Sequence, residues 1–70
     1  MKYLVVIERG PSSFGAYVPD LPGCVTAGDT HEEVIRLIQE AIEFHLEGMR
    51  EDGLPIPAPH STAELVEVHT

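Results

Sequence analysis

The chain has 70 residues, and its 12 acidic side chains against 4 Lys and Arg give a formal net charge of −8 at pH 7. A chain of this size hides about 60% of its extended surface on folding, which argues against the deep, desolvated cleft of an elaborate enzyme. Binding of DNA or RNA by this chain alone is disfavoured, because such binding relies on Lys and Arg displacing counterions from phosphates. We therefore expect one small domain over residues 1–70 that meets a basic protein partner.

The apolar N-terminal run reaches Glu8 after seven residues, which is too short for a membrane span or for a cleavable signal peptide. The single cysteine, Cys24, has no partner for an internal disulfide and supports no cysteine-based metal site. We expect a cytoplasmic, reduced protein that does not associate with membranes.

The first half of the chain predicts three strands. Residues 2–8 are rich in β-formers, a Gly-Pro-Ser-Ser turn follows at 10–13, and residues 14–18 place alternate apolar side chains on one face. Two strands joined by such a turn indicate a hairpin. A stiff loop over 19–23 and a short third strand at about 24–27 complete this half.

From about residue 30 the spacing of the apolar residues becomes that of a helix. Thr30 with Glu33 three residues later is a capping-box pattern, and Gly53 followed by Pro55 predicts the end of the helix near residue 52. At 100° per residue one face of the helix is expected to carry Val34, Ile38, Ala41, Ile42, His45 and Met49. The opposite face is acidic, as is usual for a solvated surface.

A proline-rich connector over 54–59 and a final strand over 64–69 complete a predicted β-β-β-α-β order. The fold class is therefore α+β, with an antiparallel-rich sheet and one helix on one face. Because one helix covers only one face of a sheet, the other face is solvated or buried by another molecule. We expect a homodimer or a higher homo-oligomer to cover it.

No arrangement typical of catalysis or of cofactor binding is visible, and we predict no catalytic, cofactor or metal site. The four histidines share no short ligand spacing, Cys24 lacks a neighbouring base, and no glycine-rich phosphate loop precedes the helix. We expect a hydrogen-bonded core or contact role for His45 and exposed positions for His31, His60 and His69.

One pattern is specific to a family. Residues 14–24 read Phe-x-Ala-x-Val-Pro-Asp-Leu-Pro-Gly-Cys, followed by Gly-Asp-Thr at 28–30 and by Ala-Ile-x-x-His-Leu at 41–46. This pattern resembles the HicB family of antitoxins. The resemblance implies a partial ribonuclease-H-like fold and a partner, HicA, which is a small basic toxin that cleaves mRNA. An acidic domain would neutralise such a toxin by occluding its RNA-binding and active surface.

The resemblance also leaves alternatives. Many HicB-like antitoxins carry a C-terminal DNA-binding segment, whereas this sequence ends after the expected final strand, which puts operator binding by this chain in doubt. A toxin-free oligomeric interaction protein is one alternative. A ribonuclease-H-like nuclease is another, although its first strand should carry an aspartate and here holds no carboxylate before Glu8.

The surface expected to meet the partner lies on the second strand and on the loop that follows it. Its residues are Phe14, Tyr17, Pro19, Asp20, Leu21, Pro22 and Gly23. In the other interpretation of these residues, Phe14 and the loop build only the core and a turn.

Overall fold

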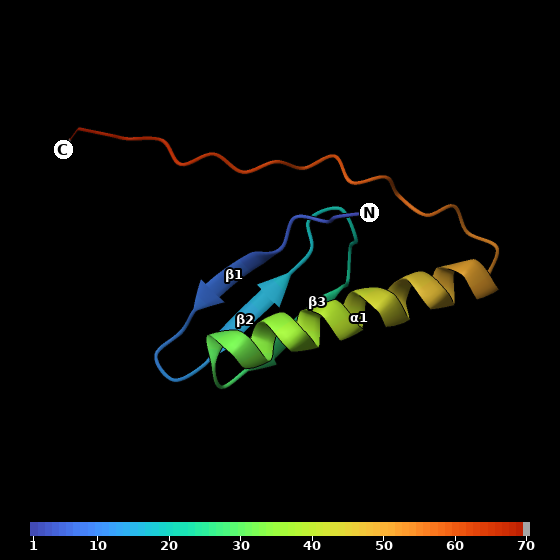
Figure 1. The fold of residues 1–70 in the computed structure, drawn as a ribbon, viewed down its shortest axis with the longest axis horizontal. Coiled ribbons are helices and arrows are strands. Elements are labelled where there is room, and N and C mark those ends of the chain that lie inside the picture. Colours follow the sequence, from blue (N-terminus) through green and yellow to red (C-terminus); the bar gives the residue numbers. More distant parts are fainter. Residues whose placement is uncertain (70) are drawn as a thin grey trace.

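The computed structural model describes residues 1–69 as a three-stranded sheet with one helix packed on one of its faces (Figure 1). The elements in chain order are β1 (Val6–Arg9), β2 (Phe14–Tyr17), β3 (Val25–Gly28) and α1 (His31–Glu51). The strand order is β1-β2-β3, and both pairs are antiparallel. The predicted α+β class, with one helix on one face of an antiparallel sheet, is confirmed.

The hairpin forms as predicted, but β1 begins at Val6 and not at residue 2. The turn is closed by the Gly10 amide, which donates to the Ser13 carbonyl at 2.8 Å. The last pair of the ladder joins Val6 to Tyr17, because the chain leaves the sheet after Tyr17 to enter the loop. Residues 2–5 consequently have no strand opposite them.

The loop over 19–23 is a closed turn whose ends are joined by hydrogen bonds. The Val18 amide donates to the Cys24 carbonyl, and the Cys24 amide donates to the Leu21 carbonyl, both at 3.1 Å. Gly23 has a φ of 85°, a left-handed conformation that glycine adopts without a steric penalty. The turn carries the Leu21 side chain into the core, where it is 1% exposed.

Both predicted ends of α1 are present. The Thr30 hydroxyl oxygen accepts from the Glu33 amide, and the Glu33 carboxylate accepts from the Asp29 amide, both at 3.0 Å. After the helix, Gly53 has a φ of 69° and the Leu54 amide donates to the Met49 carbonyl. These contacts satisfy backbone groups that a helix end leaves unpaired.

The core lies between α1 and the sheet. It consists of Ala16, Val18, Leu21, Cys24, Val34, Ile38 and Leu46, with Ala41, Ile42 and Met49 packed against it. The helix face predicted from the sequence to be apolar is therefore the face that packs on the sheet. Leu46, which is not among the six residues expected on this face, is buried, whereas His45 is half-buried.

The expected final strand over 64–69 does not form. Beyond the helix the chain continues without regular structure (Figure 1). Residues 62–69 are exposed. The proline-rich connector carries the chain along the domain, but no edge of the sheet in residues 1–69 receives the segment that follows it. The described chain thus shows β-β-β-α followed by an extended segment.

Candidate protein-binding site

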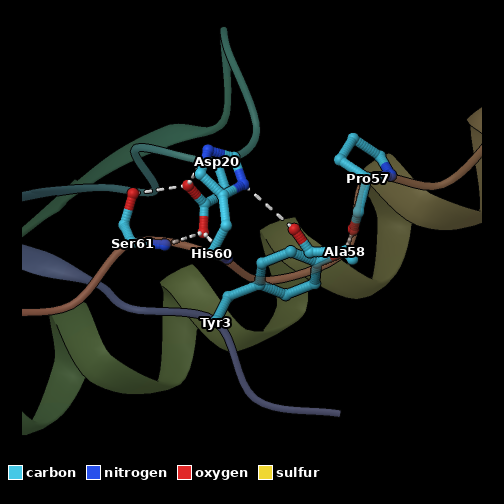
Figure 2. A network of polar contacts seen from close by, with 6 residues as sticks. All are labelled: Tyr3, Asp20, Pro57, Ala58, His60 and Ser61. Atoms are coloured by element: carbon cyan, nitrogen blue, oxygen red, sulfur yellow. Dashed lines mark hydrogen bonds and ion pairs between the residues drawn. The ribbon is translucent and has the colours of Figure 1, made fainter.

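The loop after β2 holds the C-terminal part of the chain through one buried carboxylate. Asp20 is 4% exposed, and its Oδ2 accepts from the His60 amide at 2.9 Å and from the Ser61 amide at 3.0 Å. The Ser61 hydroxyl donates to Asp20 Oδ1, and His60 Nε2 lies 3.1 Å from the same oxygen (Figure 2). We call these contacts the Asp20 clasp.

The clasp lowers the pKa of Asp20 from 3.8 to about 2. The main cause is the hydrogen bond from the Ser61 hydroxyl, followed by the bonds from the amides of Ser61 and His60. Donors aimed at a carboxylate stabilise its charged form. Asp20 is therefore an anion at neutral pH, which is the form that accepts all of these bonds.

An Asp, a His and a Ser thus meet at one point, but they do not form a nucleophilic triad. In such a triad the histidine stands between the other two and takes the serine proton. Here the carboxylate stands between them, and the other ring nitrogen of His60, Nδ1, lies 3.1 Å from the Ala58 carbonyl oxygen (Figure 2). The arrangement can position the chain but cannot activate the Ser61 hydroxyl.

A second contact holds the same segment nearer the helix. The Tyr3 hydroxyl donates to the Pro57 carbonyl oxygen (Figure 2). Ile56 packs against the core. Residues 56–61 are therefore part of the folded domain, and the chain leaves it after Ser61.

The predicted contact residues divide into two groups. Asp20 and Leu21 are buried and Phe14 is half-buried, with its ring edge-on to His31, so these three side chains serve the fold. Tyr17, Pro19, Pro22 and Gly23 are exposed. The structure keeps these four residues on neighbouring parts of β2 and the loop, where a partner can reach them.

The face of the sheet opposite α1 adds residues that the sequence analysis did not single out. Side chains alternate along a strand, so Tyr17 lies on the face opposite the buried Ala16. In the sheet register Tyr17 stands between Val6 of β1 and Val25 of β3, and Val25 is 65% exposed. We call Val6, Tyr17 and Val25 the open sheet face. Glu8, two residues from Val6, is on the same side.

The other candidate chemical groups have structural explanations. Cys24 is buried, and burial raises the pKa of its thiol, which therefore stays protonated and poorly nucleophilic. Within residues 1–69, no three His, Cys, Asp or Glu side chains come close enough together to hold a metal ion. In that same range, the one helix is not apolar enough along its length to span a bilayer.

His60 and Ser61 were not predicted from the sequence as partners of Asp20. They are 40 and 41 residues away along the chain, and two of their donors are backbone amides. An amide is present at every residue except proline, so no local pattern marks the ones that a distant carboxylate selects.

Comparison with known proteins places these features in a family. A model of the "HicB_like antitoxin of bacterial toxin-antitoxin system" matches residues 3–69. A chain of a solved "HicA3 and HicB3 toxin-antitoxin complex" superposes with a TM-score of 0.73 at 32% identity, which covers 86% of this chain and 70% of that one.

Three relatives show the same relationship in sequence. "Antitoxin HicB 2" of Photorhabdus laumondii is 35% identical over 69 residues, a match that covers 97% of this chain and 50% of the relative. A 14.9 kDa protein of Haemophilus phage HP1 is 46% identical over 57 residues, which cover 81% of this chain and 43% of the phage protein. A UPF0150 protein of Thermoplasma acidophilum is 37% identical over 70 residues and matches over 99% of both chains. The chain therefore spans half or less of the first two relatives and nearly all of the third. It belongs to the HicB-like antitoxin family of bacterial toxin–antitoxin systems.

Proposed function

We propose that the protein binds and neutralises a small, basic, mRNA-cleaving toxin of the HicA type in the cytoplasm. The observation that carries this proposal is the likeness, at 32% identity and a TM-score of 0.73, to a chain of a HicA3 and HicB3 complex. The net charge of −8 supports it, because a surface built to hold RNA phosphates is complementary to an acidic domain.

The contact surface that we propose combines the open sheet face with the exposed part of the loop. Tyr17 lies between the two, and aromatic side chains are frequent energetic centres of protein–protein interfaces. Pro19, Pro22 and Gly23 lie in a loop whose hydrogen bonds hold it in one shape, so little conformational freedom is lost on binding. Glu8 supplies a negative charge on the same side of the sheet.

Inhibition on this proposal is occlusion and needs no chemical step. The antitoxin covers the toxin surface that RNA would occupy and leaves the RNA itself untouched. The clasp contributes by fixing the loop in position, since Asp20 is inside it and ties it to residues 60 and 61.

The test is RNA cleavage by a purified cognate HicA-type toxin, titrated with this protein. We expect cleavage to stop near an equimolar ratio and the Tyr17→Ser variant to weaken inhibition by about tenfold or more, the effect of losing an interface anchor. Phe44→Ser is the matched control, because Phe44 is an exposed aromatic residue on the solvent face of α1, 79% exposed. A toxin that stays fully active at saturating antitoxin would refute the proposal and would favour the toxin-free interaction protein.

The nuclease alternative is tested in the same assay with the toxin left out. Glu8 is exposed on β1, while Asp20 is committed to the clasp, so the two carboxylates are not available together as metal ligands. We expect the protein alone, with Mg²⁺, to leave RNA and RNA–DNA hybrids intact. Cleavage that disappears in Glu8→Ala would overturn a purely binding role.

A further inference from the structure

We propose that residues 64–68 form a strand on the β1 edge of a second copy of this chain, so that two copies exchange their C-terminal segments. This inference is independent of the toxin, because it concerns a different part of the surface. It rests on the state of the segment, on the state of the edge, and on the charges that each carries.

The segment has the composition of a strand but no partner. It reads Glu-Leu-Val-Glu-Val, and Leu65, Val66 and Val68 are 101%, 75% and 72% exposed. Leucine and two β-branched residues in one run favour a pleated, partly buried conformation and are unfavourable in water. Pairing with a sheet edge would therefore stabilise the segment.

The β1 edge is open and longer than the strand itself. β1 is an outer strand of the three-stranded sheet, and over residues 1–69 its outer side carries no ladder partner. Tyr3, Leu4 and Val5 continue the edge as half-buried, apolar chain without sheet pairing. An unpaired edge of this kind offers a row of amides and carbonyls to an added strand.

A hollow beside this edge suits an apolar side chain of the added strand. It has a volume of about 240 Å³ and lies between the N-terminal segment and α1, lined by Met1, Tyr3, Gln39, Ile42, Glu43 and Leu46. A strand added to β1 places alternate side chains over the helix side of the sheet, where this hollow is. In the register that we propose, Leu65 fills it, and Val66 and Val68 lie on the opposite face of the added strand.

The charges of the two segments are complementary. The N-terminal region holds two of the four Lys and Arg residues of the chain, Lys2 and Arg9, which flank the apolar edge. The C-terminal segment holds Glu64 and Glu67, and all four side chains are exposed. Opposite charges on neighbouring strands stabilise their pairing, which matters for two copies that each carry a charge of −8.

The partner is a second copy because of the way the clasp directs the chain. Asp20 holds Ser61, and from there residues 62–69 run past the β1 side of the sheet of their own copy without pairing with it (Figure 1). The segment is thus presented outward with its anchor fixed. Reciprocal exchange between two copies uses one contact twice and closes as a symmetric dimer.

The test measures the mass of the full chain in solution by light scattering over a micromolar concentration series. We expect twice the 7.7 kDa of one chain. Leu65→Glu should weaken dimerisation by about tenfold or more, because it puts a charge where an apolar side chain is buried. Leu54→Glu should leave dimerisation unchanged, since Leu54 is an exposed leucine outside the segment, 52% exposed.

Hydrogen exchange identifies where the segment pairs. Amides of residues 64–68 should be protected in the dimer and lose protection on dilution or in Leu65→Glu. A monomer at all concentrations would overturn the proposal, and protected amides in that monomer would show pairing within one copy. A dimer that Leu65→Glu leaves intact would also overturn it. Neither result bears on toxin inhibition, which is measured at the Tyr17 surface.

Discussion

The Asp20 carboxylate and the Ser61 backbone, 41 positions apart, are joined by a 3.0 Å hydrogen bond from the Ser61 amide, and the Ser61 hydroxyl donates to the same carboxylate. Asp20 belongs to the loop after β2, and Ser61 is the last residue before the exposed C-terminal segment. One buried side chain therefore sets the shape of the loop and the point where the chain leaves the domain.

Removing the charge of Asp20 should loosen both regions. We expect Asp20→Asn to speed hydrogen exchange at the His60 and Ser61 amides and to lower the thermal midpoint, because an amide oxygen is a weaker acceptor than a carboxylate. Ser61→Ala should have a smaller effect, since the two backbone donors remain. Asp29→Asn is the control, because Asp29 is exposed and outside the clasp. Equal effects of Asp20→Asn and Asp29→Asn would contradict the clasp.

The clasp should also make stability depend on pH in the acid range. The pKa of Asp20 is about 2 in the folded chain against an ordinary 3.8, so the folded state binds the proton less readily than the unfolded state. The stabilisation is therefore complete above the ordinary value and is lost as the pH falls from about 4 to about 2. The difference in thermal midpoint between the natural chain and Asp20→Asn should shrink over that range. A difference that stays constant would show that the charge of Asp20 is not the cause.

The phase of α1 is tested by two isoleucines. Ile38 is 2% exposed in the core, and Ile38→Ala should lower the free energy of unfolding by about 2–5 kcal/mol through lost burial and the cavity left behind. Ile35, 40% exposed on the same helix, serves as the control, and Ile35→Ala should cost well under half as much. Urea denaturation of the two variants gives both values. Similar losses would mean that the helix packs on a different face.

Two glycines should respond in opposite directions to the same substitution. Gly23 has a φ of 85°, so Gly23→Ala should destabilise the chain by about 1–2 kcal/mol, although no atom crowds the new methyl group. Gly48 is inside α1 and is equally uncrowded, so Gly48→Ala should stabilise the chain by about 0.5–1 kcal/mol through helix propensity. Thermal unfolding of both variants compares the signs. A stabilising Gly23→Ala would contradict the left-handed conformation.

Much of this fold is already determined by local patterns. The capping pair at Thr30 and Glu33, the glycine after the helix and the apolar spacing from Val34 to Met49 each act over a few residues, and each predicted its element correctly. The turn before Phe14 and the loop after Val18 are local in the same sense, because backbone conformation at proline and glycine is set by the residue itself.

The tertiary structure decided what depends on distant partners. β1 starts at Val6 because β2 ends opposite it. Residues 64–68 are strand-like by composition but form no strand, because they pair with no edge of the sheet. The clasp arises in the same way, because Asp20 meets His60 and Ser61 only after α1 and the connector have returned the chain to the loop. A helix satisfies its hydrogen bonds from within, whereas a strand or a buried carboxylate takes them from elsewhere in the fold.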